Sequence, residues 1–196
     1  VAQLVERKAD VNLAMYSNGA TPLMLVCMQP VTNKGVVTTD RTAPIHMASI
    51  LVAAKADVNH RAPSAATGGI TALTIAISMK EPQLGLVRLL LNAKADAGIR
   101  FEDGLFEMPA TPLIAAMLRR HNSIVELLRE HVNLQNRWGE SPLHLASELG
   151  HSAFVKLMLS HGADTRLADA AGITPLGRAH NHRRAVDNTM GEYVAR

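Results

Sequence analysis

A short motif that starts helices recurs five times along this chain of 196 residues, and it constrains the fold more than any other feature. Each copy has Thr or Ser, then Pro or once Ala, then Leu, and the copies begin at Thr21, Thr71, Thr111, Ser141 and Thr174. The starts lie 50, 40, 30 and 33 residues apart. Because internal similarity at such periods is the signature of stacked repeats, the sequence predicts an array of similar units.

A second motif falls between the copies of the first. It reads KADVN at 8–12 and 55–59, KADAG at 94–98, HGADT at 161–165, and a shortened HVN at 131–133. Apolar residues at helical spacing, such as Ile124, Val125, Leu127 and Leu128, precede each copy of this second motif. The two motifs therefore mark the start and the end of one unit with two helices.

The residue types have defined roles in such a unit. A Thr or Ser hydroxyl caps free backbone N–H groups, and Pro is favoured at the first helical position. The second helix is predicted to end at a residue suited to a left-handed turn, such as Gly162, and an extended stretch follows. Each unit is predicted to be a helix, a turn, a second helix and an extended hairpin.

This pattern resembles the ankyrin repeat, and residues 141–164, SPLHLASELGHSAFVKLMLSHGAD, match it best. The resemblance covers essentially the whole chain. It implies an all-α fold, an ankyrin-repeat solenoid of stacked helix-turn-helix units joined by short β-hairpin-like loops. The repeats are degenerate, because Ala72 replaces Pro in one copy and His144 is the one His at the fourth motif position.

Alignment of the repeats predicts a single ankyrin-repeat domain over residues 1–196. Its parts are a partial repeat at 1–12, repeats at 13–59, 60–98, 99–133 and 134–166, and a C-terminal capping repeat at 167–196. Residues 43–48 imitate a sixth helix start, but the second motif follows too soon, so they are predicted to begin an outer helix. Residues 30–42 are then an inserted loop, and insertions at 61–69 and 99–109 lengthen two hairpins.

Both ends of the array carry expectations. Residues 1–10 read as an outer helix without its inner partner, so we expect this end to be covered by further chain or by a partner subunit, as solenoid ends require. At the other end, register places Asn188, Met190, Gly191 and Glu192 at outer-helix positions that are apolar in the preceding repeat. The loss of three apolar residues predicts a solvent-facing cap.

A metal site is the main alternative to a purely structural reading of the best-preserved repeat. His144, Glu148 and His151 would share one stripe of a continuous helix and could bind zinc or iron. Gly150 is expected to end the helix before His151, which favours a structural role for His144. Cys27 has no nearby base in the sequence and is predicted to be a buried, inert thiol. We expect no catalysis, no cofactor and no metal.

Composition bears on partners and compartment. The net charge is +3 and the pI about 9.3, but the basic residues are dispersed and aromatic residues make up 3% of the chain, so nucleic acid is not the expected partner. No apolar stretch approaches the roughly 20 residues that span a bilayer, and no direct membrane insertion is expected. With one cysteine and no visible signal peptide, the expected location is intracellular, the cytoplasm being favoured and an organelle left open.

The expected function is that of a non-catalytic module, a scaffold or adaptor, which binds a partner protein through its hairpins and inner helices. The candidate contacts are Arg119, Arg137, Trp138, Glu140, Glu148, Phe101 and Phe106, and the aligned concave positions also include Leu118 and Leu149. Phe101 and Phe106 have the alternative role of packing their own long loop. A groove with Arg and Trp suits an acidic or mixed-charge partner. The alternative function is a permanent accessory subunit of a large multi-protein assembly, which the organellar location would also fit.

Overall fold

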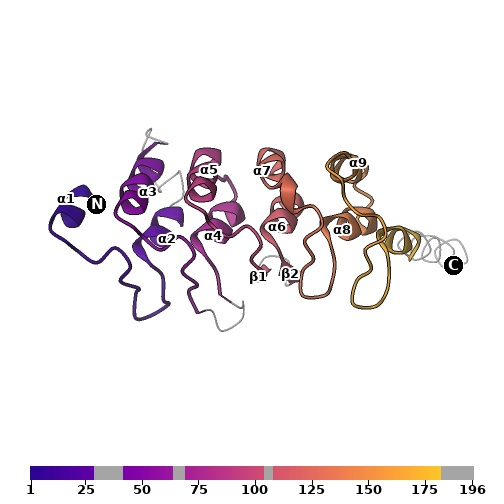
Figure 1. The fold of residues 1–196 in the computed structure, drawn as a ribbon, viewed down its shortest axis with the longest axis horizontal. Coiled ribbons are helices and arrows are strands. Elements are labelled where there is room, and N and C mark those ends of the chain that lie inside the picture. The colour runs from indigo at the N-terminus through magenta and orange to yellow at the C-terminus, as the bar shows by residue number, and fades with distance from the viewer. Residues whose placement is uncertain (29–41, 64–68, 104–107, 182–196) are drawn as a thin grey trace, which may run out of the picture.

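The computed structural model describes residues 1–28, 42–63, 69–103 and 108–181, and it shows an elongated stack of helix pairs with the first and the last described residues at opposite ends (Figure 1). Its elements are α1 (Ala2–Glu6), α2 (Pro22–Cys27), α3 (Ala43–Ala53), α4 (Ala72–Ser78), α5 (Leu84–Asn92), β1 (Phe101–Asp103), β2 (Met108–Ala110), α6 (Pro112–Leu118), α7 (Asn122–Leu127), the 3-10 helix η1 (Arg129–His131), α8 (Pro142–Glu148) and α9 (Ser152–Ser160). Residues 175–181 are helical as well.

The helices form two rows along the stack. The inner row consists of α2, α4, α6 and α8, which pack on one another in that order, and each inner helix also packs on the outer helix that follows it (Figure 1). In the outer row α1 packs on α3, α3 on α5, and α5 on α7. The predicted solenoid is confirmed, and α3 is the outer helix that the alignment of the repeats predicted for residues 43–53.

The inner helices start as the motif predicted. The hydroxyls of Thr21 and Thr111 accept hydrogen bonds from N–H groups one turn later, and Pro follows each Thr. Thr71 lacks this Pro, and its helix is secured by a capping box in which Thr74 Oγ1 accepts the Thr71 N–H at 2.9 Å. His144 does the same for Ser141 through its Nδ1 atom at 3.1 Å. Thr74 and His144 therefore have the same role. Each side chain accepts the backbone N–H of the N-cap residue three positions earlier and so completes a buried capping box.

The outer helices end in left-handed turns, as predicted for Gly162, whose φ is 79°. The second motif places lysine at the equivalent position in three other copies, and Lys8, Lys55 and Lys94 have φ values of 60°, 65° and 66°. A residue with a Cβ atom is strained in this conformation by about 1–2 kcal/mol. These three copies therefore tolerate a local backbone cost at the position that Gly162 occupies in the later repeat.

The core lies between the two rows of helices and consists of aliphatic and small side chains. The motif leucines of four copies, Leu23, Leu73, Leu113 and Leu143, are almost completely buried, whereas Leu176 of the last copy is exposed. Cys27 is buried in the same layer, as predicted, and burial raises the pKa of its thiol to about 12. Most of the stability of such a stack comes from the burial of these aliphatic side chains.

The hairpins project from the inner helices and are tied to one another. Strands β1 and β2 pair antiparallel with Phe101 opposite Ala110, and Ala62 pairs with Ile70 in the preceding hairpin. The side chain of Asn133 bonds the carbonyl of Gly162 and the N–H of Asp164 in the next repeat. Asn12 and Asn59 make the same two bonds to the repeat that follows each of them.

Several sequence predictions fall partly or wholly outside this description. The inserted loop lies almost entirely outside the described residues, and so do positions 188–192 of the expected cap. Among the residues that the structure does describe, no helix has the length and apolar character needed to cross a membrane.

Candidate functional site

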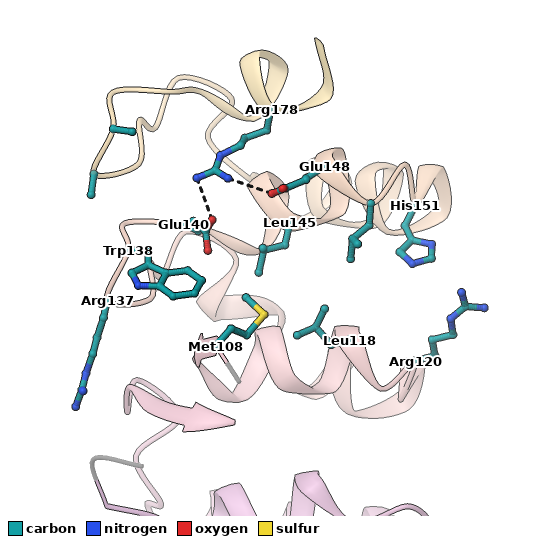
Figure 2. A pocket seen from close by; sticks show the side chains of 13 residues that line it. Met108, Leu118, Arg120, Arg137, Trp138, Glu140, Leu145, Glu148, His151 and Arg178 are labelled. Carbon is teal, nitrogen blue, oxygen red and sulfur yellow. Dashed lines mark hydrogen bonds and ion pairs between the residues drawn. The ribbon is translucent and has the colours of Figure 1, made fainter. Parts of the chain in front are cut away.

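A groove of about 960 Å³ runs between the hairpin tips and the inner helices α6 and α8 (Figure 2). Three repeats contribute to it, because Met108 belongs to β2, Trp138 to the next hairpin and Arg178 to the helical residues 175–181. Its lining consists of Met108, Leu118, Arg120, Arg137, Trp138, Glu140, Leu145, Glu148, Leu149, His151, Ala170, Ala171 and Arg178. The groove is thus a product of the stacking, and no single repeat contains it.

Trp138 lies at the tip of its hairpin with half of its surface exposed, 50%. The backbone N–H of Trp138 donates to Asn136 Oδ1 at 2.9 Å. Its backbone carbonyl accepts the N–H of Ala170 from the next hairpin at 2.9 Å. The following residue, Gly139, has a φ of 76°, and a Cβ atom there would lie 2.6 Å from the Ala170 nitrogen. The backbone under the indole is therefore held on both sides, which lowers the entropy that the hairpin backbone loses on binding.

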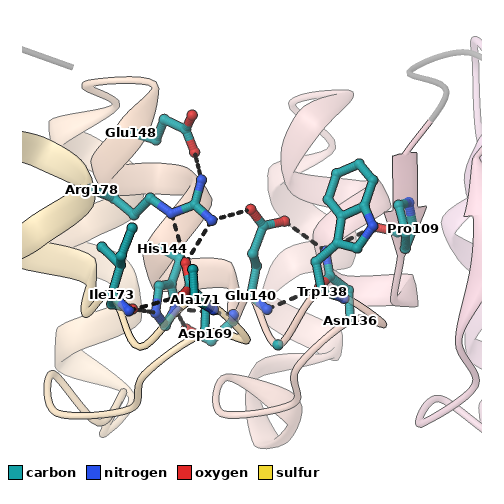
Figure 3. A network of polar contacts seen from close by, with 12 residues as sticks. Pro109, Asn136, Trp138, Glu140, His144, Glu148, Asp169, Ala171, Ile173 and Arg178 are labelled. Atoms are coloured by element: carbon teal, nitrogen blue, oxygen red, sulfur yellow. Dashed lines mark hydrogen bonds and ion pairs between the residues drawn. The ribbon is translucent and has the colours of Figure 1, made fainter. Parts of the chain in front are cut away.

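A network of charged side chains closes one end of the groove (Figure 3). The guanidinium of Arg178 contacts Asp169 Oδ2 through Nη2 at 2.6 Å and through Nε at 2.8 Å. It also contacts Glu140 Oε1 at 3.0 Å and Glu148 Oε2 at 3.2 Å. One cation thus holds three carboxylates, and two of these are almost completely buried, Glu140 and Asp169.

This network continues toward the preceding repeat. Asn136 Nδ2 donates to Glu140 Oε2 at 2.9 Å and to the carbonyl of Pro109 at 3.0 Å, and Asn136 Oδ1 accepts the N–H of Glu140. Figure 3 shows the resulting chain of polar contacts from Pro109 to Arg178. Because every link is buried or half-buried, the chain fixes the three hairpins relative to one another.

The pKa values in the network favour the charged forms. Burial raises the pKa of Asp169, but hydrogen bonds from the Ile173 N–H, the Arg178 guanidinium and the Ala171 N–H outweigh it and hold the pKa below its ordinary value. Burial also lowers the pKa of Arg178, and the three carboxylates around it reverse this effect and raise it. The Asp169–Arg178 pair is therefore ionised at neutral pH.

A family model described as "Ankyrin repeats (3 copies)" matches the chain over residues 80–169 and again over 113–187. Together these matches span more than half of the sequence. The chain belongs to the ankyrin repeat family. Ankyrin repeats are generally protein–protein interaction modules, and proteins of this family are typically non-catalytic.

Two curated proteins are similar to parts of this chain. The chain is 29% identical over 115 residues to FPV031 of fowlpox virus (strain NVSL), which is named as an ankyrin repeat protein, and the match covers 57% of this chain and 33% of the relative. It is 33% identical over 127 residues to the B-cell lymphoma 3 protein homolog of Mus musculus, covering 63% of this chain and 27% of that protein. The chain thus spans a third or less of the length of these relatives.

Among solved structures, the fold is similar to a chain in the complex of the Bd0816 predatory endopeptidase from Bdellovibrio bacteriovorus with the immunity protein Bd3460. The TM-score is 0.66 at 22% sequence identity, and the match covers 93% of this chain and 84% of that one. At this identity the likeness concerns the fold alone.

Several candidate contacts predicted from the ankyrin alignment meet in the groove. Trp138, Arg137 and Glu148 line it, together with Leu118 and Leu149 at the aligned concave positions (Figure 2). The sequence placed these five residues on one face because the ankyrin register superimposes hairpin tips and inner-helix ends of successive repeats.

Other candidate contacts lie elsewhere. Glu140 lines the groove wall but is buried and bonded to Asn136 and Arg178, so its carboxylate serves the fold. Arg119 does not line the groove, since its Nε donates to the carbonyl of Ser78 in an earlier repeat at 3.2 Å. Phe101 is not exposed: it is buried in β1 as part of the hydrophobic core and is not open to a partner. Phe106 lies outside the described residues.

Arg178 is the residue that sequence reasoning missed. It occupies the fifth position of the inner-helix motif, where the other repeats have Leu25, Ile75, Ala115 and Leu145. An arginine at a position that is otherwise apolar was a visible signal that a carboxylate partner lies nearby. Arg178 is the link through which the C-terminal repeat contacts Glu140, which in turn bonds to Asn136.

The metal alternative at His144, Glu148 and His151 does not form a continuous stripe. Helix α8 ends at Glu148, Gly150 has a φ of 66°, and His151 begins the next helix, as predicted. His144 is buried, with Nδ1 accepting the Ser141 N–H and Nε2 3.0 Å from the carbonyl of Ile173. Both ring nitrogens are engaged, and within the described ranges no group of three His, Cys, Asp or Glu side chains is placed to bind a metal ion.

Proposed function

We propose that the chain is a non-catalytic scaffold or adaptor module that binds a partner protein in the groove between the hairpin tips and helices α6 and α8. The observation that carries the proposal is the half-exposed indole of Trp138 beside an apolar groove floor. Tryptophan is among the residues that most often dominate binding energy at protein interfaces. A large side chain on a backbone clamped by Asn136 and Ala170 is a preorganised anchor.

Membership of the ankyrin repeat family supports a protein as the partner. The position of the groove supports the surface of hairpin tips and inner helices as the place where this partner binds. Leu145 and Glu148 come from α8 and Leu118 from α6, so the same surface combines side chains of two inner helices with the hairpin tips. The volume of the groove is in the range of ligand-binding pockets in proteins. The side chain of Arg119, in contrast, makes a hydrogen bond within the stack of repeats. The groove is therefore the surface to test first.

Site-directed photo-crosslinking tests this proposal. A photoreactive phenylalanine analogue is placed at position 138, and in a matched control at Arg166, whose side chain is 93% exposed and which does not line the groove. Partner chains captured from position 138 are identified by mass spectrometry, purified, and titrated against wild type, Trp138→Ala and Arg166→Ala. We expect Trp138→Ala to weaken binding by about 2 kcal/mol, roughly thirtyfold, and Arg166→Ala to leave it unchanged. Equal affinity for wild type and Trp138→Ala contradicts the proposal.

A permanent accessory subunit is the second candidate function, and a separate surface favours it. Leu13, Met15 and Tyr16 of the first hairpin are all exposed, with Leu13 at 70%. A cluster of large apolar side chains on a surface usually marks a contact with another chain. This candidate predicts that the purified chain self-associates and that the triple change of Leu13, Met15 and Tyr16 to Ser restores a monomer in sedimentation velocity. A monomeric wild-type chain contradicts it.

A further inference from the structure

The floor of the groove is apolar along its length. Met108 and Leu118 are half-buried, Leu145 is nearly buried, and Leu149 is exposed at the end of α8. In Figure 2 the side chains of Met108, Leu118 and Leu145 point into the space between α6 and α8. A partner segment in this space must therefore present apolar side chains to the floor.

The acidic side chains that line the groove are already engaged by a cation. Only Glu140 and Glu148 are acidic among the lining residues that the structure describes, and both contact the guanidinium of Arg178. A basic residue of a partner would have to compete with this internal arginine for them. The groove therefore offers little to a cationic ligand in spite of its two carboxylates.

Positive charge is placed at both ends of the groove. Arg137 lies beside Trp138 on the hairpin tip, and Arg120 lies at the opposite end beside His151 (Figure 2). Both arginine side chains are exposed. The apolar floor thus lies between two exposed guanidinium groups, each of which can attract a carboxylate.

From these observations we infer that the groove binds a segment of a partner protein in which apolar residues are flanked at both ends by Asp or Glu. This inference rests on the proposed function, because it names the chemistry of the partner that the Trp138 groove receives. The apolar centre covers the floor, and the flanking carboxylates pair with Arg120 and Arg137. Charge at the ends selects the partner and sets its direction of approach, while burial in the centre supplies affinity.

The test uses synthetic peptides as probes. Random peptides displayed on phage are selected on the full chain after removal of those that also bind Trp138→Ala. Each selected sequence is synthesised with its own flanks, with Lys flanks and with Ser flanks around the same centre. Dissociation constants are measured by fluorescence anisotropy for wild type and for the double variant Arg120→Glu, Arg137→Glu.

We expect the selected flanks to be rich in Asp and Glu, and the acidic peptide to bind about tenfold tighter than its Lys-flanked version at low salt. The double variant reverses this order. If it does not fold, the wild type still decides, because the advantage of acidic flanks must shrink at about 1 M NaCl, where the screening length is about 3 Å.

Three results would overturn the inference in distinguishable ways. Selected peptides that depend on Trp138 but have basic or neutral flanks refute the acidic partner and leave the proposed function intact. No enrichment that depends on Trp138 refutes both. Displacement of the acidic peptide by a single-stranded oligothymidylate at equal concentration shows that the two arginines and Trp138 form a nucleic-acid site, which also refutes a protein partner.

Discussion

Replacement of Arg178 by methionine removes the one cation that holds three carboxylates together. Methionine keeps most of the apolar stem, so the change isolates the charge. The Asp169 side chain is 0% exposed and the Glu140 side chain 4% exposed, and both lose an ion pair. Glu148 is 41% exposed and is free to turn to solvent. The cost is therefore set by two buried carboxylates that lose their counter-charge.

The size of the effect follows from what these carboxylates retain. Removal of one member of a buried ion pair costs about 3–5 kcal/mol. Asp169 keeps the N–H groups of Ala171 and Ile173 at 2.9 Å each, and Glu140 keeps Asn136 Nδ2 at 2.9 Å. We therefore expect the lower end, about 3 kcal/mol, which at a urea dependence of about 1–3 kcal/mol/M lowers the midpoint by about 1–3 M.

The fluorescence of Trp138, the only tryptophan of the chain, can follow unfolding. Its carbonyl accepts the N–H of Ala170, which follows Asp169 of the charged network, so the probe lies next to the network. Urea titrations of wild type and Arg178→Met are compared with Arg166→Met, which loses an arginine whose side chain is 93% exposed and 3.9 Å from Asp164. Exposed pairs contribute about 0–1 kcal/mol. If Arg178→Met lowers the midpoint no more than Arg166→Met does, the network does not stabilise the C-terminal repeats.

The pH dependence adds a second check on the same reasoning. The folded pKa of Asp169 is below its unfolded value of about 3.9, so its contribution to stability is present above that value. The contribution is lost as the pH falls through the folded pKa. The stability gap between wild type and Arg178→Met should therefore narrow progressively below about pH 4. A gap that is constant from neutral pH down to about pH 3 would show that the Asp169 carboxylate is not its source.

Further predictions concern single residues. His144→Ala should lower the free energy of unfolding by about 1–3 kcal/mol, because it leaves the buried Ser141 N–H without its acceptor and removes one of the two hydrogen bonds to the Ile173 carbonyl; stoichiometric zinc or iron in purified wild type would contradict this structural role. In urea titrations, Lys55→Gly should raise the free energy of unfolding by about 0.5–1 kcal/mol because it relieves the left-handed strain, whereas Lys156→Gly inside α9 should lower it by about 1 kcal/mol. Cys27, with its pKa of about 12, should resist iodoacetamide at about pH 8 in the folded chain and react on unfolding in urea; fast reaction of the native chain would refute its burial.

Local signals in the sequence were sufficient for the helices and their order. Thr21 and Thr111 with the following Pro, the apolar spacing before each second motif, and Gly162 all act within one or two turns of the chain. Interactions at such short range in the sequence can be predicted without a structure. The same locality explains why His151 was correctly separated from His144, since Gly150 interrupts the helix between them.

The register of the repeats also placed Trp138, Arg137 and Glu148 on one face, because equivalent positions of a solenoid line up in space. It did not show which of these side chains are accessible. Glu140 occupies a hairpin position like theirs, yet the arginine at position 178, from the next repeat, takes its carboxylate inward. Accessibility depends on contacts between residues that are about 30–40 positions apart, and one repeat alone does not contain them.

The sequence by itself thus determined the unit, its helix boundaries and the family, because these depend on backbone caps and apolar periodicity inside each repeat. Only the tertiary structure decided that Phe101 is buried in the core, that Arg119 bonds to the Ser78 carbonyl, and that Arg178 lines the groove and holds three carboxylates. The physical reason is that a buried charge must find its partner across a repeat boundary, and the partner is chosen by the geometry of stacking.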